Sequence, residues 1–282
     1  MDKYLILNAD DFGYDPETNE TVETLIRSER ITSASLLACA PAAADAADRA
    51  KKLDFAVGAH LSLTSDGADA PWRCLSGAAS IGKTLPPAAG TLTFGAKRRD
   101  VRRELAAQTA FIEALGCRID HADAHAGALY GLAGRRFYLD VFDLCAEKQL
   151  PFRFPKTPDF FIRTLGGRFR TPLRLLHRLI ARQALAKGVP LPDDVFSDPR
   201  APAEIGSRDA LFAYYLNAVA SCGPGVTEIF LHPRKAAAAP GSAWQKRLWE
   251  YELLASGRLL QAAKEHGVTV VSPARAYALE RG

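Results

Sequence analysis

Two adjacent aspartates, Asp10 and Asp11, end a short apolar run near the N-terminus. Adjacent carboxylates repel each other unless a cation or a shared proton relieves the repulsion, so this pair favours a metal or a raised pKa. One aspartate would then bind an ion and the other would accept a proton. The structural alternative is a pair that caps a turn before a helix.

Two histidines offer further ligands for such an ion. His60 and His125 each stand at the end of a different predicted strand. A lone histidine in an apolar strand is more often a satisfied core residue than a ligand. One aspartate and two histidines at three strand ends, however, form a set able to hold one divalent ion with an open position for water. By pattern alone we favour that interpretation over separate structural roles.

Other polar residues at predicted strand ends could complete the chemistry. Asp123 shares a strand face with His125, where it could orient an imidazole or hold a water. His232 ends an apolar strand and could act as a general acid toward a leaving amine. Arg153 could hold a carboxylate or bind substrate, and a surface arginine is an equal alternative. For His121, a buried structural role is at least as well supported as a catalytic one.

The elements that must position these side chains alternate along the chain. Apolar runs near residues 4, 34, 57, 119, 152, 195, 228 and 269 predict seven or eight strands. Helical patterns follow Asp15 and cover residues 42–53, 98–115, 136–148, 171–187, 210–220 and 245–266. This alternation predicts an α/β fold, a (β/α) barrel that is distorted or seven-stranded, with its chemistry at the C-terminal ends of the strands.

Residues 65–97 interrupt the alternation with a stretch rich in Gly, Ala and Pro. The stretch is longer than most connections in compact domains. We interpret it as a lid or binding loop within a single domain over residues 1–282. Trp72 in this loop could stack on a pyranose ring.

Composition narrows the class of protein. The chain has 282 residues, 48% of them hydrophobic, and its formal net charge of +4 is too mild to imply a nucleic-acid partner. The arginines of residues 171–187 are interpreted as a solvated helix face, because no aromatic residues interleave them. The N-terminus lacks the apolar stretch of a signal peptide or membrane span, and the five cysteines form no Cys-x-x-Cys pair. We therefore expect a soluble, cytoplasmic protein.

Four segments together resemble the YdjC-like carbohydrate deacetylase family. They occur in the expected order and span most of the chain: Asn8-Ala9-Asp10-Asp11-Phe12-Gly13, His60-Leu61-Ser62-Leu63-Thr64, Asp123-Ala124-His125 and His232-Pro233. The resemblance implies a barrel related to polysaccharide deacetylases that removes an acetyl group from an N-acetylated sugar. It also implies that Asp11, His60 and His125 bind one divalent ion, while Asp10 is the base and His232 is the acid.

One departure from the family concerns Gly127 and Leu129, which stand where the family usually has further histidines. The metal set survives this loss, but the substrate walls would change, so the sugar could differ from chitooligosaccharides. Two imidazoles and a carboxylate do not distinguish zinc, magnesium, manganese, cobalt or nickel. The expected partner is a small-molecule or lipid-linked N-acetylated sugar. A homodimer is expected only from the resemblance to the family.

Two alternatives to a sugar deacetylase stay open. A metal-dependent hydrolase on this fold could cut a phosphoester or a non-sugar amide, although six histidines are few for a two-metal phosphoesterase. A non-catalytic sugar-binding barrel is the second alternative. The missing histidines favour it, and the intact Asp10-Asp11 pair argues against it.

Overall fold

The computed structural model of the chain describes residues 2–66, 71–87, 95–131, 136–236 and 239–281. Within them, seven strands form one curled sheet in which every pairing is parallel. The order is β4-β3-β2-β1-β6-β5, and β7 pairs with the start of β1. The strands are β1 (Lys3–Phe12), β2 (Ser33–Leu36), β3 (Val57–Leu61), β4 (Ile119–Ala124), β5 (Asp194–Phe196), β6 (Gly225–Leu231) and β7 (Thr269–Val270).

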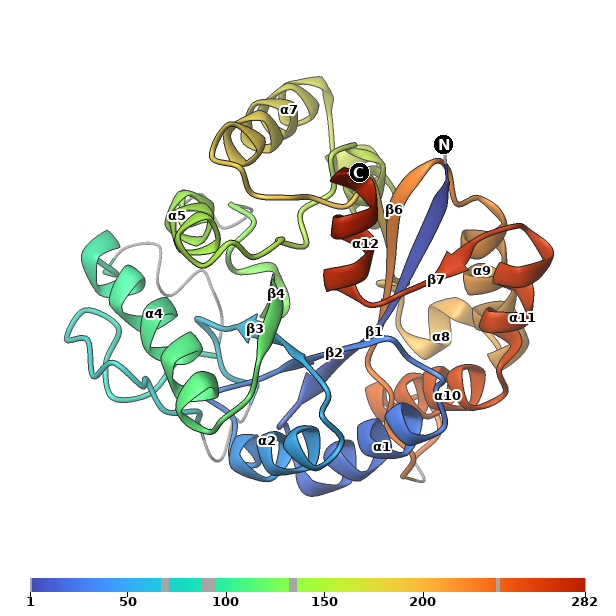
Figure 1. Cartoon of the computed structure of the whole chain (residues 1–282), viewed down its shortest axis with the longest axis horizontal. Helices are drawn as coiled ribbons and strands as arrows, with labels where there is room; N and C mark the ends of the chain where they lie inside the picture. Colours follow the sequence, from blue (N-terminus) through green and yellow to red (C-terminus); the bar gives the residue numbers. More distant parts are fainter. Residues whose placement is uncertain (1, 67–70, 88–94, 132–135, 237–238, 282) are drawn as a thin grey trace.

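Helices surround this sheet and join its strands (Figure 1). The first begins where the sequence provides a start signal, because the Asp15 carboxylate accepts a hydrogen bond from the Thr18 N–H at 2.7 Å and Pro16 follows the cap. The helices are α1 (Pro16–Arg27), α2 (Ala43–Lys52), α4 (Arg98–Ala114), α5 (Tyr138–Lys148), α6 (Asp159–Leu165), α7 (Thr171–Ala186), α8 (Pro202–Ile205), α9 (Arg208–Ala220), α10 (Ala243–Ala255), α11 (Arg258–Glu265) and α12 (Pro273–Arg281).

The gap between β4 and β5 is filled by an irregular segment, residues 151–156. Phe152 makes a single parallel bridge to Ala122 of β4, and its N–H donates to the Pro190 carbonyl ahead of β5 at 3.0 Å. The strand predicted near residue 152 is therefore reduced to one bridge. Pro151 and Pro155 explain this, because neither can donate a ladder hydrogen bond.

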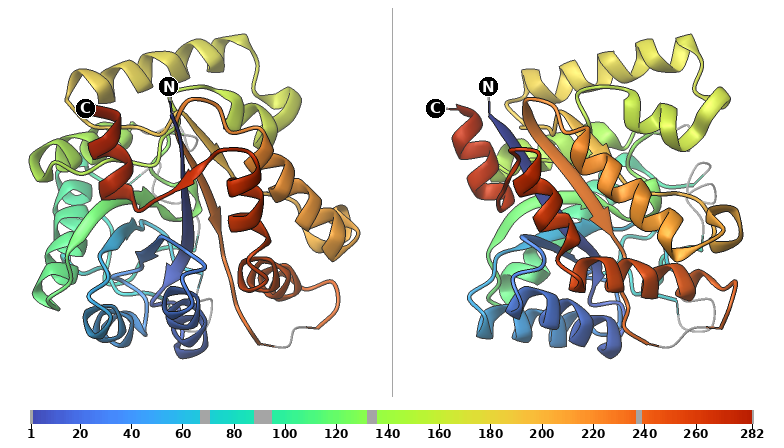
Figure 2. Two further views of the ribbon diagram at one scale, coloured as in Figure 1. Left: turned by 45° about the vertical axis from the view of Figure 1, so that its right-hand side comes forward. Right: turned by 90° about the vertical axis from the view of Figure 1, so that its right-hand side faces the viewer.

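The two ends of the barrel differ. Helix α12 packs on β1, β4 and β6, and Tyr277 joins Ile6 and Val226 in a small apolar cluster near the starts of the strands. At the other end, β1 and β6 finish in polar residues that α12 does not cover (Figure 2). The predicted fold class, a distorted, seven-stranded α/β barrel, is confirmed, and its strand C-termini are free to carry a site.

The prediction of one long helix over residues 245–266 is wrong, because this segment contains two helices. They are α10 and α11, separated at Gly257, which has a φ of 73°. A β-carbon there would also lie 2.8 Å from the Arg30 guanidinium. The glycine thus permits both a left-handed turn and a close approach, and the chain changes direction.

The described part of residues 65–97 is packed against the barrel. Trp72 and Leu85 are buried in a small cluster with Leu37. The Glu104 carboxylate of α4 accepts hydrogen bonds from the Leu75 and Ser76 N–H groups at 3.1 and 2.8 Å. Residues 71–87 therefore form a layer docked on the barrel, and their role as a lid or binding loop stays a prediction; residues 67–70 and 88–94 lie outside the described residues.

Candidate active site

A bulge in β1 brings both neighbouring aspartates to one pocket. Ala9 pairs with Ala34 and Phe12 with Leu36, so two residues of β1 stand opposite one residue of β2. Asp11 occupies the extra position in a left-handed conformation, with a φ of 67°, which aspartate tolerates better than most residues. This bulge removes the alternation that would send consecutive side chains to opposite faces.

Asp11, His60 and His125 converge as the sequence predicts. His60 Nε2 and His125 Nδ1 each lie 3.5 Å from Asp11 Oδ1, and the two nitrogens are 3.4 Å apart. Ligand atoms about 2.1 Å from a tetrahedral ion are about 3.4 Å apart, so this triangle has the size that a zinc-like ion requires. Asp11 Oδ1 is buried and accepts no hydrogen bond from the described residues. The three atoms therefore fit one divalent ion.

Each of these three side chains also has a hydrogen-bond partner on the side away from the shared triangle: a carboxylate for each histidine and a guanidinium for the aspartate. His60 Nδ1 lies 2.5 Å from Asp123, His125 Nε2 lies 3.1 Å from Asp66, and Arg247 of α10 donates to Asp11 Oδ2 at 2.7 Å. Partners of this kind fix the ring orientation and the tautomer of metal-binding histidines. The geometry thus leaves one atom of each side chain for an ion.

The charge balance of the site also favours a cation. Burial alone would lower the pKa of His60, but Asp123, Asp10 and Asp11 outweigh it and raise that pKa to about 10. For Asp11, burial opposes ionisation, yet Arg247 and the two histidines hold its pKa well below the ordinary value. The site is therefore short of positive charge, which either a proton or a metal ion supplies.

Asp10 is oriented by a dense set of donors. Arg153 Nη1 and Nη2 each donate to its carboxylate at 2.8 Å, and Asn8 donates at 2.6 Å. Arg153 is buried and also contacts Asp123 and Glu228 at 2.7 Å. Of the alternatives for Arg153, the geometry therefore supports holding a carboxylate, and the same contact gives Asp123 a positioning role behind His60.

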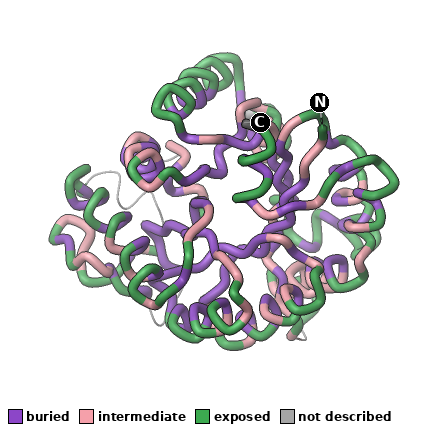
Figure 3. The backbone as a smooth tube through the Cα atoms, in the orientation of Figure 1, coloured by how far each residue is buried: buried purple, intermediate pink, exposed green. Residues whose placement is uncertain are grey.

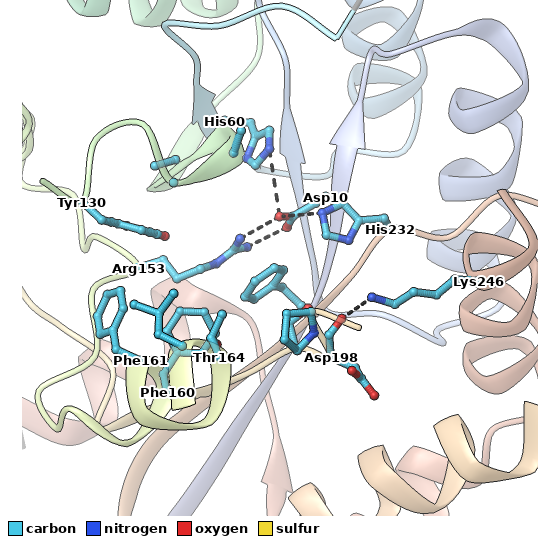
Figure 4. A pocket seen from close by; sticks show the side chains of 17 residues that line it. Asp10, His60, Tyr130, Arg153, Phe160, Phe161, Thr164, Asp198, His232 and Lys246 are labelled. Atoms are coloured by element: carbon cyan, nitrogen blue, oxygen red, sulfur yellow. Dashed lines mark hydrogen bonds and ion pairs between the residues drawn. The ribbon is translucent and has the colours of Figure 1, made fainter. Parts of the chain in front are cut away.

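A pocket of about 400 Å³ opens beside Asp10 (Figure 4). His232, at the end of β6, lines it and has Nε2 3.7 Å from Asp10 Oδ2. Burial lowers the pKa of His232, although Asp11 and Asp10 act in the opposite direction. Figure 4 shows Tyr130 and Phe161 on the side of the pocket away from His232. The pocket thus has a polar end and an aromatic end.

The structure bears on three further expectations, and it changes the one for Trp72. Trp72 is only 3% exposed and its ring centre lies 5.1 Å from that of His125, so it supports a ligand instead of offering a free face to a sugar. His121 is buried between Ser33 and Asp120, as its structural interpretation predicts. Of the two departures from the family, Leu129 is buried in the core, whereas Gly127 lines the pocket and leaves space there.

Sequence reasoning missed Asp66 and Arg247, which hold His125 and Asp11. Asp66 follows the His60 segment closely, so its place after a strand end was a usable signal. Arg247 gave no such signal, because it comes from a helix late in the chain and reaches the site only through the fold. It packs there over the rings of Tyr14 and Trp244.

Two deacetylases are similar to this chain over nearly its whole length. A carbohydrate deacetylase of Geobacillus stearothermophilus is 29% identical over 286 residues, which cover 99% of this chain and 100% of that protein. A chitooligosaccharide deacetylase of Proteus mirabilis is 28% identical over 272 residues, or 95% and 96% of the two chains.

A crystal structure from Enterococcus faecalis, described provisionally as a cellobiose-phosphate cleavage protein, shares the fold. It has a TM-score of 0.71 and 21% identity, and covers 97% of this chain and 98% of that one. No helix of the described residues has the length and apolar character needed to cross a membrane. The family model described as YdjC-like protein matches residues 4–265. The chain therefore belongs to the YdjC-like protein family.

Proposed function

We propose that this protein is a metal-dependent carbohydrate deacetylase that releases acetate from an N-acetylated sugar. The observation that carries the proposal is the Asp11, His60 and His125 triangle next to Asp10, at the polar end of a pocket whose other end is aromatic. Aromatic faces suit the apolar face of a sugar ring. The carbohydrate and chitooligosaccharide deacetylases among the relatives support the same chemistry.

An ion held by Asp11, His60 and His125 would supply Lewis acidity, which polarises an amide carbonyl and lowers the pKa of water. Asp10 would remove the proton of the attacking water. Its carboxylate is fixed by Arg153 and Asn8, so it does not have to reorganise during the reaction. Arg153 in turn donates a hydrogen bond from Nε to Glu228 at 2.7 Å, which fixes the position of the guanidinium.

His232 would deliver a proton to the departing sugar nitrogen. Its lowered pKa leaves it neutral at neutral pH, so it has to receive a proton before it can donate one. Asp10 Oδ2 lies 3.7 Å away and can pass on the proton taken from water. The products are acetate and the free amine.

A two-metal phosphoesterase is less well supported. A second set of candidate ligands, Asp10, His60 and Asp123, exists among the described residues. It shares His60 with the first set, and the Arg153 guanidinium already lies between its two carboxylates. The positive charge of this guanidinium already compensates the two buried carboxylates, as a second metal ion would.

The test is acetate release from a panel of N-acetylated sugars by protein that is stripped of metal and reloaded with zinc, cobalt, nickel, manganese or magnesium. We expect turnover to return with at least one ion. Asp10→Asn should keep stoichiometric metal and lose about 10²- to 10⁴-fold in kcat. Asp54→Asn, an exposed aspartate before β3, is the matched control. Native protein that takes up no metal and releases no acetate would refute the proposal and favour the sugar-binding alternative.

A further inference from the structure

Helix α7 exposes an unusual amount of apolar surface. Six large apolar side chains of the described residues are exposed, and five of them belong to this helix: Leu173, Leu175, Leu176, Leu179 and Leu185. Isolated exposed leucines are common, but a cluster on one element marks a binding surface. Figure 3 shows α7 as a largely exposed helix at the periphery of the molecule.

A large apolar groove lies along α7. Its volume is about 790 Å³, and its lining includes Tyr138, Phe154, Phe169, Leu173, Leu176 and Leu179. Leu175 is 56% exposed on the same helix and does not line the groove. The groove can therefore be separated experimentally from the general exposure of the helix.

The groove adjoins the pocket beside Asp10. Tyr130, Phe161 and Leu165 line both cavities, and Figure 4 shows Tyr130 and Phe161 at the aromatic end of the catalytic pocket. A substrate that extends from Asp10 past these side chains would enter the groove. Because the two cavities are continuous, a substrate bound at Asp10 can reach the apolar surface of α7.

The segment that carries α7 is basic. Residues 160–192 contain seven basic residues and no aspartate or glutamate. Arg174, Arg178 and Arg182 are exposed on α7 next to the leucines. Such an amphipathic surface suits a ligand with a hydrocarbon portion and a neutral or anionic polar portion.

We propose that the substrate is an amphipathic N-acetylated sugar whose apolar aglycone lies in the groove along α7. This inference rests on the proposed deacetylase function and specifies its substrate class. The sugar would occupy the pocket at Asp10 and His232, and the hydrocarbon would pass Phe161 and Leu165 to contact Leu173 and Leu176.

The test compares methyl, butyl and octyl glycosides of N-acetylglucosamine, each below its critical micelle concentration, with the metal-loaded enzyme. We expect kcat/KM to increase by about two- to fourfold for each methylene that the groove buries. A second series keeps the methyl glycoside and lengthens the N-acyl group. This series separates an apolar aglycone from an apolar acyl chain.

Two variants localise the effect. Leu173→Ser/Leu176→Ser changes two groove residues, and Leu175→Ser changes an exposed neighbour that does not line the groove. Measured as the ratio of kcat/KM for the octyl and the methyl glycoside with the same protein, the double variant should lose most of the gain from the octyl chain. The single variant should retain the gain, and unfolding curves verify that all three proteins are folded.

The other outcomes overturn the inference. Equal kcat/KM for all three glycosides, with the methyl glycoside still deacetylated, would leave the deacetylase function intact and refute the apolar aglycone. A gain only in the N-acyl series would assign the groove to the acyl group. A wild-type dimer that becomes a monomer in the double variant, together with a flat glycoside series, would assign the groove to a second copy of the chain. Absence of acetate from every compound would remove the deacetylase function itself.

Discussion

The polar cluster at the catalytic pocket and the apolar surface along the adjoining groove follow opposite rules. At Asp11, His60 and His125, ionisable side chains are buried and each is paired with a further polar group. Along α7, leucines are exposed in the part of the chain that the structure describes. Burying charge is costly unless it is paired, and exposing apolar surface is costly unless a ligand or partner covers it. Both regions thus depart from the usual distribution of side chains, and they lie at two cavities that share Tyr130, Phe161 and Leu165.

The two regions differ in how accurately the side chains must be placed. The polar cluster requires that interatomic distances of about 2.7 to 3.5 Å, between groups from four parts of the chain, be kept to within a few tenths of an ångström. The α7 surface depends on area, and any apolar side chain in the right place would serve. Substitutions should therefore have large, specific effects in the first region and small, graded effects in the second.

The largest effect is expected for Asp11→Asn. Asparagine keeps the size of the side chain and tolerates the left-handed backbone at this position, but it removes the anionic ligand. Metal content should fall far below one ion per chain, and turnover should decrease by about 10³-fold or more. Metal analysis and acetate release measure both. Full metal content in this variant would show that the triangle is not the binding site.

Arg247→Gln should weaken metal binding without abolishing it. The guanidinium holds Asp11 Oδ2, and loss of such a supporting contact typically reduces metal affinity by about 10- to 100-fold. The readout is the metal dissociation constant measured by competition with a chelator. Arg234→Gln is the matched control, because Arg234 also lies over the Trp244 ring but pairs with Asp15 and Glu17. Equal weakening in both variants would contradict a specific role for Arg247.

A smaller effect is expected at His177, on the buried side of α7. Burial lowers the pKa of this histidine to about 4, and its ring stacks on Phe154 with centres 4.9 Å apart. The unfolded chain binds a proton near pH 6.5 and the folded chain does not, so acidification from about pH 6.5 to 4 favours unfolding. Between pH 7.5 and pH 5, wild type should lose about 2 kcal/mol of unfolding free energy relative to His177→Phe. Urea denaturation at both pH values measures this, and parallel pH dependences would show that His177 does not titrate as expected.

The smallest effect is expected for Leu175→Ser. This side chain is 56% exposed and outside the groove, so its replacement should change the free energy of unfolding by less than about 0.5 kcal/mol. Thermal or urea unfolding provides the measurement. A loss of 2 kcal/mol or more would require that Leu175 be buried in solution, against another chain for example, and would remove the contrast between the two regions.

Much of the candidate site could be predicted from local sequence. Asp10, Asp11, His60, His125 and His232 each follow an apolar run, and parallel strands bring such positions to one end of a barrel. Segment boundaries were less predictable where a single residue decides the outcome. Gly257 divides a helical pattern that is otherwise continuous, and two prolines reduce a predicted strand to one bridge.

What only the tertiary structure decided are the contacts between distant segments. Arg247 reaches Asp11 across 236 positions of sequence, and Arg153 reaches Asp10 across 143. Trp72 lies in a segment without periodicity and becomes buried against His125. The sequence by itself determined which residue types end the strands, because hydrophobic periodicity is a local property. The partners that fix those residues, and the groove along α7, arise only when the curled sheet and its helices place remote elements side by side.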